Sequence, residues 1–197
     1  MSSPLRRSEK IARVLSYLFL PPVLNITAFA FVIFSFESEN GSPWLIFFYT
    51  SIFTAILPIL IFILFLRKGK IADPDARERS ERHVPYIVFA VVITAGLLFI
   101  PWANHAPGIR SLFIIYLFNL IFLFLVNLFW KISAHTMGAG GFLGTALFVF
   151  GSWGLFAFPV VLALAWARLE LKCHTPAQLI AGAIMGLANT LILFHYL

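Results

Sequence analysis

The chain has 197 residues, of which 61% are hydrophobic and 11% are charged, and its formal net charge is +6. A soluble domain is typically about half apolar and a quarter charged, so this composition excludes a soluble globular protein and indicates an integral membrane protein. The basic residues lie between apolar runs, which favours retention beside anionic lipid and argues against a nucleic-acid-binding domain. The single cysteine, Cys173, excludes an internal disulfide.

Apolar runs of about 20 residues are long enough to cross the roughly 30 Å hydrocarbon core of a bilayer. No cleavable signal peptide is expected, because the first run is long, contains Pro21-Pro22 and lacks a small-residue cleavage site. We expect clear membrane spans, in chain order, at Ile11–Phe36, Trp44–Leu66, Val84–Trp102, Arg110–Trp130 and Pro176–Leu197.

The remaining apolar region, Ser133–Leu171, has two interpretations. Gly151-Ser152-Trp153-Gly154 divides it into two pieces, Ser133–Phe150 and Gly154–Leu171, each short for a full span. The alternative is one 25-residue helix from Phe142 to Trp166. Hydropathy alone does not decide between them.

The distribution of charge favours two helices in this region. The chain then makes seven spans, and thirteen of its 14 Lys and Arg residues lie on one side, with Arg110 opposite. The positive-inside rule assigns that side to the cytoplasm. The sequence therefore predicts an all-α, polytopic bundle of six or seven transmembrane helices that forms one domain over residues 1–197. We expect it in the inner membrane of a bacterium.

Three polar segments, at about 67–83, 131–141 and 167–178, fall on the predicted cytoplasmic side. The first contains six cations interleaved with four acids. Its Arg79 and Arg82 come just before Pro85, which suits the first turn of a helix, and arginine there is suited to bidentate phosphate contacts. The alternative is a solvated, charge-balanced loop.

The second segment contains His135 close to a helix start. Ser133 or Thr136 can cap that helix, and the glycines that follow allow a second helix or a ligand to approach closely. A helix N-terminus attracts an anion. The alternative is a histidine that only makes interfacial hydrogen bonds.

The third segment has the pattern of a capped helix start. Thr175 suits the N-cap, Pro176 the first helical position and Gln178 the third, as in a capping box. His174 then lies immediately before the helix, and Arg168 ends the preceding helix and reaches back across the turn. Arginine, histidine and free helix N–H groups together favour an anionic phosphate ligand.

The last two segments resemble motifs of the PAP2 (type 2 phosphatidic acid phosphatase) superfamily. The third motif, Ser-Arg-x5-His-x3-Asp, is matched at Arg168 and His174, while Ala167 and Gln178 replace its first and last residues. The second motif, Pro-Ser-Gly-His, is matched at Ser133 and His135. The first motif, Lys-x6-Arg-Pro, is not present as written. Lys70 and Arg77 have its spacing but Glu78 follows them, so Arg79 and Arg82 are the preferred phosphate ligands.

The resemblance implies a membrane enzyme that hydrolyses a lipid phosphate or diphosphate, such as phosphatidate, phosphatidylglycerophosphate or a polyprenyl diphosphate. It implies that His174 attacks phosphorus to form a phosphohistidine and that His135 protonates the leaving alcohol. Arg168 and Ser133 would bind phosphoryl oxygens. No cofactor and no metal are expected, because the histidines show no ligand spacing with acids.

The substitution of Gln178 for the motif's aspartate supports an alternative function. A glutamine carbonyl can hold one histidine tautomer, but it cannot stabilise an imidazolium as a carboxylate does. Glu170 or an acid of the first polar segment could take that role. Otherwise the protein would be a slow enzyme, or a PAP2-like protein that binds or moves a lipid phosphate without hydrolysing it.

Overall fold

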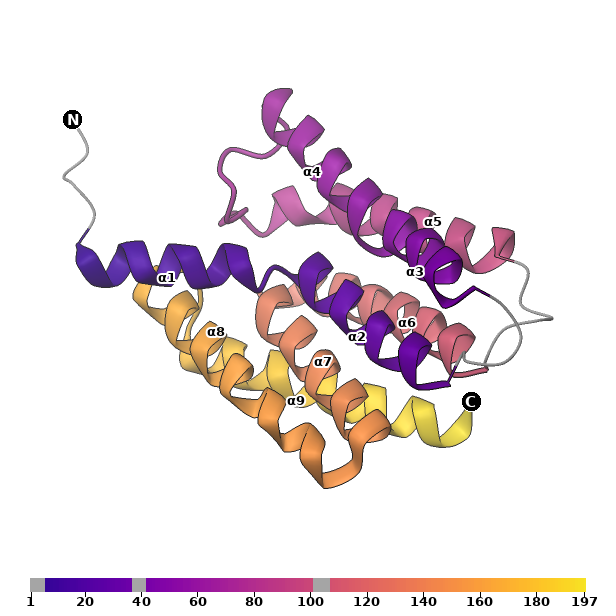
Figure 1. The fold of residues 1–197 in the computed structure, drawn as a ribbon. Helices are drawn as coiled ribbons and strands as arrows, with labels where there is room; N and C mark the ends of the chain where they lie inside the picture. Colours follow the sequence, from indigo (N-terminus) through magenta and orange to yellow (C-terminus); the bar gives the residue numbers. More distant parts are fainter. Residues whose placement is uncertain (1–5, 37–41, 101–106) are drawn as a thin grey trace.

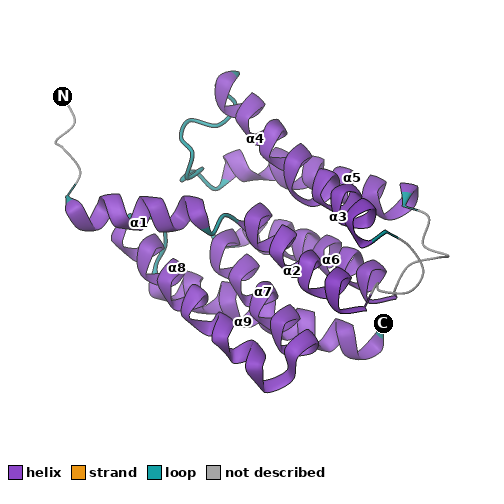
Figure 2. Cartoon of the chain, in the orientation of Figure 1, coloured by secondary structure: helices purple, strands orange, loops and turns teal. Residues whose placement is uncertain are grey.

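The computed structural model describes residues 6–36, 42–100 and 107–197, and every regular element within them is a helix (Figures 1 and 2). The prediction of an all-α protein is confirmed. The elements are α1 (Arg7–Leu18), α2 (Pro21–Phe36), α3 (Pro43–Ser51), η1 (Ile52–Ile56), α4 (Leu57–Arg67), η2 (Ser80–Arg82), α5 (His83–Phe99), α6 (Pro107–Phe129), α7 (Ala134–Phe150), η4 (Gly151–Ala157), α8 (Phe158–Glu170) and α9 (Pro176–Tyr196).

By length and composition, five helical segments of the described chain could cross a membrane, or six if the bent pair α1 and α2 counts as one span. These helices have the length and apolarity that a polytopic membrane protein needs. Trp102, the predicted end of the third span, lies outside the described residues. The five segments are Pro43–Arg67, Ser80–Phe99, Pro107–Phe129, Ala134–Glu170 and Pro176–Tyr196.

The predicted span Ile11–Phe36 consists of two helices and not of one continuous helix. The helix breaks before Pro21, and α1 and α2 meet at a bend of 45°. Proline has no N–H to donate and disfavours a helical residue before it, so the chain restarts there. Helix α1 has basic residues beside exposed apolar ones such as Val14 and Leu18, which is the pattern of a helix at a membrane surface.

The segment Ala134–Glu170 is helical throughout but folds back on itself. In a straight α-helix Gly154 and Ala146 would lie about 12 Å apart. Here a Cβ on Gly154 would overlap the backbone of Ala146, and α8 returns antiparallel to α7 (Figure 1). The favoured division into two helices therefore agrees with the structure, and the alternative of one straight helix from Phe142 to Trp166 is wrong.

Helices α3 and α4 are joined by η1, a short π-helix. Its cause lies in Pro58, which has no N–H to give to residue 54, so the backbone takes a wider turn before it. The hydroxyl of Thr54 donates to the Thr50 carbonyl at 2.7 Å within this stretch. The turn sets the direction in which the side chains of α4 face.

Helices α7 and α9 pack closely and run in the same direction. A Cβ on Gly182 would lie 2.8 Å from the Ser133 carbonyl oxygen, and one on Gly186 would overlap the Met137 carbonyl oxygen. Small residues allow such backbone approach between membrane helices. Both helices therefore begin at the same end of the bundle.

Gly186→Ala is expected to destabilise the protein by about 2 kcal/mol, because the added methyl group overpacks a backbone contact with no room to yield. The control is Gly108→Ala, where the new Cβ would meet only the Val32 Cγ1 atom at 3.3 Å. Thermal unfolding in detergent should show a lower midpoint for Gly186→Ala alone. Equal midpoints for the two variants would contradict the packing described for α7 and α9.

Candidate functional site

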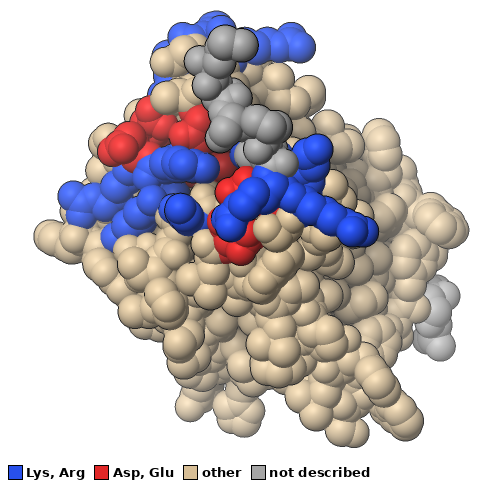
Figure 3. All heavy atoms as spheres, turned by 90° about the vertical axis from the view of Figure 1, so that its left-hand side faces the viewer, with Lys and Arg blue, Asp and Glu red and all other residues tan. Residues whose placement is uncertain are grey.

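Most charged residues of the described chain gather at one end of the bundle, which we call the polar end. It comprises α1, the loop 68–79 with η2, residues 130–133 and the turn 171–175, and Figure 3 shows the Lys, Arg, Asp and Glu side chains on this face. Helices α5, α7 and α9 all begin here. Their N-termini bring positive dipole ends to the same face.

A cavity of about 520 Å³ opens at the polar end and continues between α2, α4, α5, α6 and α7. Arg82, His135, Arg168 and His174 line it together, although they come from three separate segments of the chain. Four of the sequence-predicted site residues are therefore brought to one cavity. Most of the remaining lining is apolar and comes from the membrane-spanning helices.

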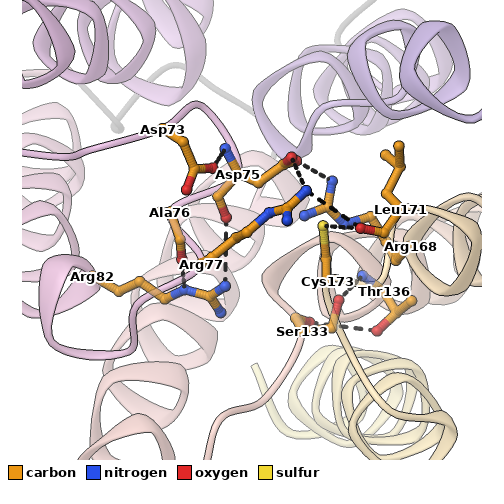
Figure 4. Close-up of polar contacts among 10 residues, drawn as sticks. All are labelled: Asp73, Asp75, Ala76, Arg77, Arg82, Ser133, Thr136, Arg168, Leu171 and Cys173. Atoms are coloured by element: carbon orange, nitrogen blue, oxygen red, sulfur yellow. Dashed lines mark hydrogen bonds and ion pairs between the residues drawn. The ribbon is translucent and has the colours of Figure 1, made fainter. Parts of the chain in front are cut away.

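Arg168 is the most completely buried of these groups, with 1% of its surface exposed. Its Nη1 atom donates to Asp75 Oδ1 at 2.7 Å (Figure 4). Its Nε and Nη2 atoms are buried and have no hydrogen-bond partner in the described part of the chain. Unpaired donors on a buried cation are costly, so they mark a position where an anion would be stabilised.

Asp75 also belongs to the site, although the sequence analysis did not distinguish it from the other acids of the first polar segment. Burial by itself would raise the pKa of its carboxyl, but the charge and hydrogen bond of Arg168 outweigh that and hold the pKa below its usual value. Arg77 lies 3.8 Å from the same carboxylate. Asp75 and Arg168 are 93 residues apart, and no local sequence pattern indicates such a pair.

Arg82 is enclosed by the turn that precedes it. Its Nε donates to the Ala76 carbonyl at 2.7 Å, and its Nη1 donates to the Ile132 carbonyl at 3.2 Å. Ala76 has φ of 43°, a conformation that few non-glycine residues adopt, and this aims its carbonyl at the guanidinium. Arg79 is exposed and does not line the cavity, so only one of the two predicted arginines reaches the site.

The capping box predicted at the start of α9 is present and orients His174. Gln178 Oε1 accepts the Thr175 backbone N–H at 3.2 Å, and Thr175 Oγ1 accepts the Gln178 N–H at 3.4 Å. The same Oε1 lies 3.1 Å from His174 Nδ1. The Thr175 N–H identifies this atom as the amide oxygen, and because an amide oxygen has no proton to donate, His174 Nδ1 carries the proton. The Nε2 lone pair is left unprotonated.

His174 is largely buried, with 8% of its surface exposed. Burial and the positive charge of Arg82 lower the pKa of its imidazole to about 3, against the opposing effect of the Gln178 hydrogen bond. The imidazole is therefore neutral near pH 7. A neutral imidazole with a free lone pair can act as a nucleophile.

We expect NMR of ¹⁵N-labelled histidine to show His174 as the neutral Nδ1–H tautomer down to about pH 3. The unfolded chain takes up this proton near pH 6.5. The stability that the neutral imidazole contributes is thus complete above pH 6.5 and lost as pH falls towards 3. The His174 resonance is identified as the one missing from the spectrum of His174→Gln. A resonance that titrates near pH 6.5 would contradict the burial of this side chain.

The other predicted site residues differ in their positions. His135 is the second residue of α7 and faces the cavity. Ser133 is the N-cap of α7, accepts the Thr136 N–H at 3.3 Å, and is buried without lining the cavity. Glu170 accepts the Ser8 hydroxyl at 2.7 Å and so anchors α1. Neither Glu170 nor Asp75 bonds to His174, so Gln178 is its orienting partner.

Cys173, beside the site, is a buried thiol whose Sγ donates to the Leu171 carbonyl at 3.5 Å, and burial raises its pKa. Over the described ranges, no group of three or more His, Cys, Asp or Glu residues could hold a metal ion. Searches against protein-family profiles, curated proteins and solved structures gave no match to this chain.

Proposed function

We propose that the protein is a membrane phosphatase of the PAP2 type that acts on a lipid phosphate or diphosphate. The observation that carries the proposal is that one cavity is lined both by His174, whose Nε2 is unprotonated, and by the buried Arg168, whose Nε and Nη2 atoms have no partner among the described residues. A nucleophile and an anion-binding cation on one cavity wall are the two parts that phosphoryl transfer needs first.

The reaction proceeds in two displacements. His174 Nε2 attacks phosphorus, the bond from phosphorus to the lipid oxygen breaks, and His135 gives that oxygen a proton. Water then attacks the phosphohistidine, His135 accepts a proton from it, and inorganic phosphate leaves. Bound phosphate supplies the negative charge that allows His135 to hold its proton in the first step.

Arg168 and Arg82 neutralise the charge on the phosphoryl oxygens. Asp75 holds Arg168 before substrate binds, and the phosphate competes with this carboxylate for the guanidinium. The unpaired Nε and Nη2 atoms of Arg168 offer the first contacts, so the phosphate does not need Asp75 to leave beforehand. Hydrogen bonds between charged groups of this kind are the stronger class.

The lipid tail lies in the apolar part of the cavity between the helices. The phosphate remains at the polar end, which we assign to the cytoplasmic side from the charge distribution. A cysteine introduced at Glu78, which is exposed in loop 68–79, should be protected from impermeant thiol reagents in intact cells. Labelling there would reverse the assignment of sides.

The test is phosphate release by purified protein in detergent. We expect release from at least one of phosphatidate, phosphatidylglycerophosphate and polyprenyl diphosphate, with His174→Ala inactive. If the wild-type protein and His174→Ala are equally inactive on all three, the proposed hydrolysis is wrong.

A second candidate function is lipid-phosphate binding or transport without hydrolysis. It is favoured by the neutral Gln178 at the position where a carboxylate would stabilise imidazolium, and by the prior engagement of Arg168 by Asp75. Binding of lipid phosphates by an inactive wild-type protein would support this second function.

A further inference from the structure

Two side-chain amides line the mostly apolar part of the cavity, Asn25 of α2 and Asn119 of α6. Polar side chains at membrane depth are costly and usually serve a function or a helix contact. Neither amide belongs to the phosphate site described above. Their hydrogen bonds show which of their polar atoms remain free to bind a ligand.

Asn119 is fixed by a neighbouring helix. Its Oδ1 accepts from Asn189 Nδ2 at 3.0 Å, which orients the amide. Its own Nδ2 has no partner among the described residues and faces the cavity wall at Gly141, where an added Cβ would lie 3.9 Å away. Asn25 makes no side-chain hydrogen bond within the described ranges. The contact between α6 and α9 therefore accounts for the Asn119 oxygen. It does not account for the N–H donors of Asn25 or of Asn119.

The two amides lie at one depth below the phosphate site. Along α7, Gly141 is six residues beyond His135, which places Asn119 about 9 Å deeper than the histidine. Gly138 is three residues beyond His135, and a Cβ added to it would lie 3.3 Å from the Cβ of Pro21 in α2. Asn25 follows Pro21 by four residues in the same direction, which places it about 10 Å below His135.

We propose that Asn25 and Asn119 form a subsite that donates hydrogen bonds to the ester carbonyl oxygens of a glycerol-based lipid phosphate. This inference rests on the proposed function and names its substrate class. An ester-linked lipid carries acceptor oxygens a few bonds beyond the phosphate, at the depth where these donors lie. A prenyl chain carries none, so it would leave both amides unpaired in an apolar cavity.

The experiment compares three probes: dioleoyl phosphatidate, the dioleyl ether analogue that lacks both carbonyls, and farnesyl phosphate. Binding is measured in the His174→Ala background, where no probe is consumed, and phosphate release is measured with active protein. We expect the ester to bind more tightly than the ether by a factor of roughly two to ten for each hydrogen bond.

Asn25→Leu should lower this preference by the factor that its hydrogen bond contributes and leave binding of the ether unchanged. The matched control is Thr27→Val, in the same helix, whose hydroxyl bonds to the Val23 carbonyl at 3.0 Å and does not line the cavity. Asn119→Leu should act in the same direction, but it also breaks the contact with Asn189, so Asn25→Leu is the decisive variant. Thermal unfolding confirms that each variant is folded.

The outcomes separate this inference from the proposed function. An ester preference that Asn25→Leu reduces supports the subsite even if the wild-type protein releases no phosphate, in which case only hydrolysis fails. Phosphate release with equal binding of ester and ether, or a preference that Asn25→Leu leaves intact, overturns the subsite alone. Failure of all three probes to bind overturns the subsite, and it overturns the proposed function as well when no phosphate is released from any of the three substrates named above.

Discussion

His135→Ala is expected to slow phosphate release from a lipid phosphate by a factor of about 10² to 10⁴, the usual contribution of a general acid. The effect should be far smaller with p-nitrophenyl phosphate, because nitrophenolate leaves without needing a proton. His174→Ala should abolish release from both substrates, since it removes the nucleophile. Initial rates for the two substrates with the two variants give the comparison.

The control for this pair is His195→Ala, at the far end of α9, which should match the wild-type protein on both substrates. Equal losses of His135→Ala activity on both substrates would contradict a proton-donating role. That result would leave His135 as a phosphate-binding or positioning group.

Arg168→Met is expected to destabilise the protein by about 3 kcal/mol, because it leaves the partly buried carboxylate of Asp75 without its hydrogen-bonded partner and with only the more distant Arg77. The same substitution should abolish phosphate binding. Asp75→Asn combined with Arg168→Met should restore much of the stability but none of the binding. Thermal unfolding and binding of inorganic phosphate measure the two properties separately.

Asp75→Asn alone should tighten phosphate binding by about tenfold, because the competing carboxylate charge is gone while Arg168 keeps its donors. Glu78→Gln is the matched control, an equal charge change at an exposed position of the same loop. Equal gains for the two variants would mean that net charge, and not competition for Arg168, governs affinity.

Much of the fold could be predicted because the controlling signals are local. Hydropathy located the long helices, and Thr175-Pro176 with Gln178 predicted the start of α9 to the residue because capping depends on neighbours in sequence. The same local chemistry placed His174 beside Gln178. Pro21-Pro22 also indicated the break between α1 and α2. The length of the apolar run nevertheless favoured a single span.

The rest of the site depends on contacts between distant residues. Arg79 and Arg82 both precede Pro85, and only the short turn η2 decides that one is exposed and the other buried. The sequence does not distinguish Asp75 from the other three acids of its loop, because what sets it apart is the contact with Arg168 of α8. Hydropathy could not reveal the reversal at η4 either, because its cause is the backbone contact that Gly154 permits.

The π-turn η1 also keeps one wall of the cavity in register. Thr54, Pro58 and Phe62, within or just after it, all line the cavity. A π-turn holds one residue more than an α-helical turn, and one extra residue in a regular α-helix would rotate everything beyond it by about 100°. Phe62 would then turn away from the cavity, and the tail cavity would lose part of one wall. The wide turn absorbs the extra residue, so the side chains before Pro58 and those after it stay on the same side of the helix.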